Sequence, residues 1–149
     1  MKKFAIATMI AVAATAASAL EVGVTAGRDY AGTSRNVAGL TVGQNLGPVG
    51  VTVGFDRATQ GANDQDRYSL VAGYNVATLG PVTVAVKGGA AYIDNQAGQD
   101  GYAALVGVGA NLPVAKKLAL TLDATRQIGQ DRVNSYNGNR VTAGVKFVF

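Results

Sequence analysis

The last ten residues of the chain, 140–149, alternate between two kinds of side chain with a period of two. One parity is apolar and ends in two aromatic residues: Val141, Ala143, Val145, Phe147 and Phe149. The other parity is mostly small or polar and carries the cations Arg140 and Lys146. A period of two indicates a β-strand with one apolar side, and aromatic residues at the end of such a strand are typical of strands that face lipid.

The first nineteen residues have the layout of a secretory signal peptide. Lys2 and Lys3 precede an uncharged apolar stretch, and Ala17-Ser18-Ala19 supplies a cleavage site of small residues. The alternative is a membrane anchor, but the stretch is short for a spanning helix, which needs about 20 apolar residues. We therefore expect residues 1–19 to be removed and residues 20–149 to form the mature domain.

The composition excludes several classes of function. The chain has no cysteine and no histidine, so it lacks a disulfide framework and the commonest general base and metal ligand. Two of its 13 basic residues lie in the leader, which leaves 11 against 9 acidic residues, and this small excess does not indicate nucleic-acid binding. The acidic pairs Asp64/Asp66 and Asp94/Asp100 are interpreted as solvated loop charges. We expect no enzyme activity, no metal and no cofactor.

The same alternation recurs along the rest of the mature chain. It predicts eight strands: 20–30, 35–44, 49–57, 67–76, 82–92, 102–112, 118–127 and 140–149. Segments of about ten residues are long enough to cross a bilayer as tilted strands. Three connections are tight and contain proline: 45–48, 78–81 and 113–117. Four connections are polar and mostly longer: 31–34, 58–66, 93–101 and 128–138.

A weak internal repeat follows the tight turns, with Leu46-Gly-Pro-Val, Leu79-Gly-Pro-Val and Leu112-Pro-Val at similar spacing. Each repeat unit holds only two predicted strands, whereas a propeller blade needs four. In hydrocarbon, backbone groups are satisfied only in helices and closed barrels. The pattern therefore predicts an all-β fold, an eight-stranded antiparallel up-and-down transmembrane β-barrel. The soluble alternative, a β-sandwich or a periplasmic ligand-binding barrel, is disfavoured because the less apolar parity looks too small and too charged for a water-excluding core.

Nine charged residues share the parity that is expected to face the lumen. Glu21 and Lys146 are expected near the tight-turn end, and Lys87 and Asp123 near the middle. The other five are expected near the long-loop end: Asp29, Arg35, Asp56, Arg67 and Arg140. Four acids and five bases nearly cancel, which favours a network of ion pairs that plugs the lumen. The alternative is a small porin-like channel for ions or small solutes.

A second group of residues lies on the apolar parity at the long-loop ends of the predicted strands. It comprises Arg28, Tyr30, Arg57, Tyr68, Tyr92, Tyr102 and Arg126. Charges and tyrosines are tolerated at a membrane interface, and guanidinium groups suit phosphate. We expect this girdle to contact lipopolysaccharide phosphates. The alternative is that these strand ends are simply wet.

The terminal Val145, Phe147 and Phe149 resemble the C-terminal signature of bacterial outer-membrane β-barrels, which the barrel-assembly machinery reads. The whole mature chain resembles the small eight-stranded barrels of the OmpA transmembrane-domain, OmpX and NspA type. This resemblance rests on the leader, the strand count, the alternation of turns and loops, and the ending Phe147-Val148-Phe149. It implies a monomer in the outer membrane, in contact with outer-membrane lipid and lipopolysaccharide, with a structural or surface-interaction role. We expect no periplasmic domain of the kind that many OmpA-type proteins carry, and the loops are short for an adhesin.

Overall fold

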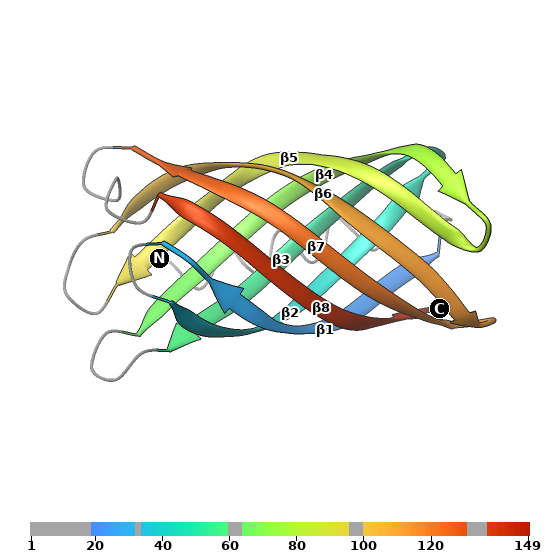
Figure 1. The fold of residues 1–149 in the computed structure, drawn as a ribbon, viewed down its shortest axis with the longest axis horizontal. Helices are drawn as coiled ribbons and strands as arrows, with labels where there is room; N and C mark the ends of the chain where they lie inside the picture. The colour runs from blue at the N-terminus through green and yellow to red at the C-terminus, as the bar shows by residue number, and fades with distance from the viewer. Residues whose placement is uncertain (1–18, 32–33, 60–63, 96–99, 131–136) are drawn as a thin grey trace.

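A computed structural model describes residues 19–31, 34–59, 64–95, 100–130 and 137–149. The expected signal peptide lies outside the described residues except for Ala19. The chain forms eight strands: β1 Leu20–Asp29, β2 Arg35–Leu46, β3 Val49–Thr59, β4 Gln65–Leu79, β5 Val82–Asn95, β6 Gly101–Ala115, β7 Leu118–Gly129 and β8 Gly138–Val148. Each strand pairs antiparallel with its neighbour in sequence, and β8 pairs with β1, so the sheet closes into a barrel (Figure 1). The predicted fold class is confirmed. In the described part of the chain, no helix is long and apolar enough to span a membrane.

The two ends of the barrel are built differently. At the end on the right of Figure 1, here called the turn end, two-residue turns join β2 to β3, β4 to β5 and β6 to β7, and the chain terminates there. Gly47 and Gly80 open the first two turns with φ of 65° and 60°, a conformation that suits glycine at the first central position of a hairpin turn. The other four connections lie at the opposite end, here called the loop end.

Several strands extend beyond the limits that the sequence predicted. β4 begins at Gln65, β5 continues to Asn95, and β6 runs through Pro113 to Ala115, so that the turn expected over 113–117 is only Lys116 and Lys117. The register between β6 and β7 shifts between Pro113 and Ala115. A bulge at this point accommodates a proline that cannot donate a ladder hydrogen bond.

The apolar parity faces outwards. Exposed large apolar side chains occur on β1, β2 and β4 to β8, among them Val24, Leu40, Leu70, Val86, Val108, Leu122 and Val145. A monomer in water rarely exposes so continuous an apolar surface, whereas a membrane barrel requires one. The orientation is opposite to that expected for the soluble barrel or sandwich.

The interior at the loop end is more apolar than the sequence indicated. Ile93 is fully buried, and Val37 and Leu105 also point inwards and are buried. Ile93 was expected to begin a loop, but β5 continues past Tyr92, which keeps Ile93 on the inward parity of Ala91. The expectation that the inward parity cannot exclude water is therefore wrong for the loop-end half of the barrel.

Candidate functional site

Four charged side chains from four strands meet inside the loop end, and we call them the loop-end cluster: Asp29 on β1, Asp56 on β3, Arg67 on β4 and Arg140 on β8. Arg140 Nη2 donates to Asp29 Oδ2 at 2.6 Å, and Arg67 Nη2 and Nε donate to Asp56 Oδ2 at 2.5 and 2.9 Å. Each of these pairs joins adjacent strands in register, Asp29 opposite Arg140 and Asp56 opposite Arg67. All four residues are buried.

A further contact connects the two pairs across the lumen. Arg140 Nη1 lies 3.3 Å from Asp56 Oδ2, so one carboxylate accepts from two guanidinium groups. Because β1 and β2 lie between β8 and β3 in the sheet, this contact links two strands that are not neighbours across the lumen. Gly39 on β2 makes room for it, since a Cβ at that position would collide with Asp56 Oδ1.

The fifth predicted loop-end charge, Arg35, makes a separate contact. Its Nη1 donates to Gln65 Oε1 at 3.0 Å, and Gln65 is almost completely buried. Gln65 was expected in the loop 58–66, because polar residues at strand ends resemble loop. Gln127, another buried inward glutamine, was placed in a predicted strand but not among the lumen residues. Extending the inward parity of Arg67 by two residues would have found Gln65.

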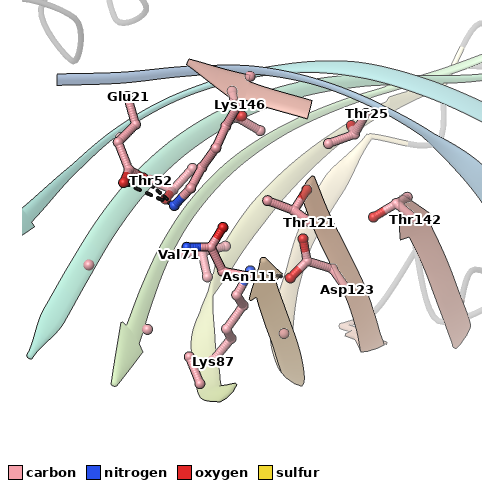
Figure 2. A pocket seen from close by; sticks show the side chains of 18 of the residues that line it. Glu21, Thr25, Thr52, Val71, Lys87, Asn111, Thr121, Asp123, Thr142 and Lys146 are labelled. Atoms are coloured by element: carbon pink, nitrogen blue, oxygen red, sulfur yellow. Dashed lines mark hydrogen bonds and ion pairs between the residues drawn. The ribbon is translucent and has the colours of Figure 1, made fainter. Parts of the chain in front are cut away.

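Two further ion pairs occupy the middle and the turn end of the lumen (Figure 2). Lys87 Nζ pairs with Asp123 from β5 to β7, over Gly109 of β6, where a Cβ would collide with both side chains. Lys146 Nζ donates to both carboxylate oxygens of Glu21 at 2.9 Å. The Lys87 side chain remains 29% exposed, so this half of the lumen is accessible to solvent.

A cavity of about 250 Å³ occupies the lumen between these groups. Its lining runs from Glu21 and Asn45 at the turn end to Asp56 and Arg67, and the wall is rich in hydroxyl groups (Thr25, Thr41, Thr52, Ser69, Thr83, Thr121, Thr125 and Thr142). We call this cavity the lumen well. It ends against the loop-end cluster, beyond which the inward side chains are buried.

On the outer surface near the loop end, the predicted girdle divides into two arcs. One arc is an aromatic ladder in direct cross-strand register over β3 to β6: Phe55, Tyr68, Tyr92 and Tyr102. Ring centroids are 5.2 Å apart for Phe55 and Tyr68 and 5.3 Å apart for Tyr92 and Tyr102, distances typical of stabilising aromatic pairs. Tyr92 Oη also donates to Asp100 Oδ2 at 3.1 Å. Phe55 lies in the predicted strand 49–57 but was not assigned to the girdle.

Arg57 lies beside this ladder and is already paired. Its Nε and Nη2 donate to Asp66 Oδ1 and Oδ2 at 2.7 and 2.8 Å, a bidentate ion pair on the outer surface. The interpretation of Asp66 as a solvated loop charge is wrong, because β4 begins at Gln65 and places Asp66 opposite Arg57. Arg28 and Arg126 lie on the other arc, on β1 and β7, and both are exposed.

Comparison with known proteins supports the architecture. No protein-family model and no curated protein matches this sequence. Solved structures do match. Neisserial surface protein A is 17% identical with a TM-score of 0.63, and the match covers 88% of this chain and 96% of that one. A major outer membrane protein from Thermus thermophilus is 17% identical with a TM-score of 0.60, and the match covers 87% of this chain and 99% of that one. The attachment invasion locus protein Ail of Yersinia pestis is 13% identical with a TM-score of 0.59, and the match covers 89% of this chain and 97% of that one. The chain has the fold of the small eight-stranded outer-membrane β-barrels. At these identities the likeness establishes the fold and not a shared activity.

The predicted assembly-signal residues lie at the turn end of this outer-membrane-type barrel. Val145, Phe147 and Phe149 face outwards, and the two phenylalanine rings are 6.2 Å apart. Backbone hydrogen bonds fix the end of β8, from Val148 N to Lys117 O and from Phe149 N to Leu20 O, each at 2.9 Å. The last residue therefore contributes to the seam that closes the barrel and also presents an aromatic ring on its surface.

The chemistry available in the lumen of the barrel is that of paired charges and hydroxyl groups. Among the described residues, no three histidine, cysteine or acidic side chains group closely enough to hold a metal ion. Asp29, Asp56, Asp123 and Glu21 each have a cationic partner. The arrangement is suited to hold the strands of the barrel together across the lumen.

Proposed function

We propose that this protein is an integral outer-membrane β-barrel with a structural role, and that the loop-end cluster plugs its lumen. The observation that carries the proposal is the contact of Arg140 with Asp56 across the barrel, where the two residues are only 2% and 5% exposed. An eight-stranded barrel has just enough interior for side chains. A hydrated ion would have to separate buried, hydrogen-bonded charges in order to pass.

The second candidate is a small porin-like channel, and the lumen well favours it. The well contains solvent-accessible charges, including the partly exposed Lys87–Asp123 pair, and thus provides a polar path through part of the barrel. The buried cluster at the loop end interrupts this path. We therefore rank the plugged barrel above the channel.

Single-channel recording in planar bilayers tests this ranking. The mature chain, residues 20–149, is refolded, and heat-modifiable migration on a gel verifies that the barrel has closed. We expect bilayers that contain the folded protein to stay silent. Reproducible openings that change on neutralising Lys87 or Asp123 would favour the channel and contradict the plug.

The proposed cellular setting is the outer membrane, after export and removal of residues 1–19. The outward apolar surface and the fold support it, as does the aromatic chain end, which suits recognition by the barrel-assembly machinery. A single chain closes the barrel, which favours a monomer. Membrane fractionation with N-terminal sequencing of the mature protein tests the location and the cleavage; recovery in the soluble periplasmic extract would contradict the proposal.

A further inference from the structure

Two outward arginines at the loop end lie on either side of the last strand. Arg28 on β1 lies opposite Val141 of β8, and Arg126 on β7 lies opposite Asn139 of the same strand. Among the residues that the structure describes, neither arginine has an ion pair or a side-chain hydrogen bond, whereas Arg57 is held by Asp66 on the other arc. The three arginines that the sequence grouped together therefore differ: Arg57 is in an ion pair, whereas Arg28 and Arg126 are in none among the described residues.

The geometry allows the two arginines to act together. They are two strands apart and offset by two residues along β8, which places their Cα atoms about 12 Å apart from the usual strand and residue spacings. Asn139, which is exposed, lies between them on β8. Two long, mobile cationic side chains and an amide therefore lie around a single patch of surface.

The surroundings of this patch are apolar. Val24, Leu122 and Val141 are exposed on the same face towards the middle of the barrel, and Tyr30 and Ile128 are exposed towards the loop end. A cation on the lipid-facing surface of a barrel is increasingly costly as it approaches the middle of the membrane, by about 2–4 kcal/mol at the midplane. The described residues offer these arginines no carboxylate, and a lipid headgroup phosphate is an anion that the surrounding membrane supplies.

We propose that Arg28, Asn139 and Arg126 form a binding site for the phosphate of a lipid headgroup in the leaflet at the loop end. The guanidinium fork matches phosphate oxygens with paired, charge-assisted hydrogen bonds, and the asparagine amide adds a neutral donor. Val24, Leu122 and Val141, which lie towards the middle of the barrel, contact the apolar part of the same lipid. The site lies on the β7–β8–β1 arc alone. This inference rests on the proposed function in one respect, since the barrel must lie in a membrane.

The test compares Arg28→Gln, Arg126→Gln, the double variant and the matched control Arg57→Gln. Each barrel is folded in detergent, and its binding of diphosphoryl lipid A, dephosphorylated lipid A and inorganic phosphate is measured by native mass spectrometry. We expect the wild type and Arg57→Gln to bind the phosphorylated lipid at least tenfold more tightly than the dephosphorylated one. The affinity of each single variant at the site for the phosphorylated lipid should fall about tenfold, since a charged hydrogen bond contributes of that order. The double variant should no longer distinguish the two lipids.

Three outcomes would overturn the lipid site. In the first, the double variant binds the phosphorylated lipid as the wild type does. In the second, Arg57→Gln loses as much affinity for that lipid as the double variant. In the third, inorganic phosphate binds with the same dependence on Arg28 and Arg126 as the lipid. Heat-modifiable migration checks that every variant is folded. Flotation with liposomes separates this proposal from the proposed function: a barrel that floats but does not discriminate the lipids fails only the lipid site, whereas a barrel that does not float fails both.

Discussion

Arg140 Nη1 lies 3.3 Å from Asp56 Oδ2, and this contact joins β8 to β3 across the barrel. Asp56 also accepts two hydrogen bonds from Arg67, so that a single buried carboxylate compensates two buried guanidinium groups. The consequence is an unequal dependence: the cluster relies on Asp56 and Arg140, which join the two pairs, more than on Asp29 and Arg67.

Asp56→Asn is expected to destabilise the barrel strongly. The substitution keeps the volume but leaves Arg67 and one side of Arg140 without their carboxylate in a buried site. Removing one partner of a buried ion pair costs about 3–5 kcal/mol. Urea unfolding of the refolded protein in lipid vesicles measures the change. Asp66→Asn is the matched control, because it removes an ion pair on the outer surface, and it should lower the midpoint far less. Equal losses in the two variants would contradict the importance of the buried cluster.

Gly27→Ala and Gly109→Ala should differ sharply in their effect on folding. A Cβ at Gly27 would collide with the backbone of β8, at Val141 O and Thr142 Cα, and neither strand can move without opening the seam. A Cβ at Gly109 would meet only the ends of the Lys87 and Asp123 side chains, which can rotate away. We expect little heat-modifiable, folded protein for Gly27→Ala and near-normal amounts for Gly109→Ala. Similar yields for both would show that the β1–β8 contact is more tolerant than its geometry indicates.

The sequence predicted the strand number, the direction of the apolar face and the parity of the lumen charges, because a period of two fixes which residues share a face. It placed the strand ends less well. β4 and β5 continue over polar residues such as Asp66 and Asp94 that resemble loop, and their pairing becomes visible only when the opposite strand is known. The pairing of Arg57 with Asp66 depends on this register. The contact of Arg140 with Asp56 also depends on the register, because the two residues meet across the lumen only once the barrel is closed.

Arg140→Ala is expected to open the plug, whereas Lys87→Ala is not. Loss of Arg140 removes the contact across the lumen and leaves Asp29 without its cationic partner, so that this buried carboxylate draws in water. Loss of Lys87 only enlarges the lumen well and leaves the loop-end cluster intact. In planar bilayers we expect small, reproducible currents for Arg140→Ala and silence for both Lys87→Ala and the wild type. Currents from Lys87→Ala alone would place the barrier at the middle ion pair instead.

Phe149→Ala should slow assembly in cells and alter the folded barrel little. Phe149 is 66% exposed at the turn end, so that removal of its ring leaves no cavity in the protein. The backbone bond from Phe149 N to Leu20 O does not depend on the side chain and should persist. We therefore expect a wild-type unfolding midpoint in vitro, together with less heat-modifiable protein in the membrane fraction of expressing cells. Phe55→Ala is the matched control, because it removes an outward ring that is not at the chain end. If Phe55→Ala lowered the cellular yield of folded barrel as much as Phe149→Ala, the loss would reflect membrane anchoring by aromatic rings in general and not recognition of the chain end.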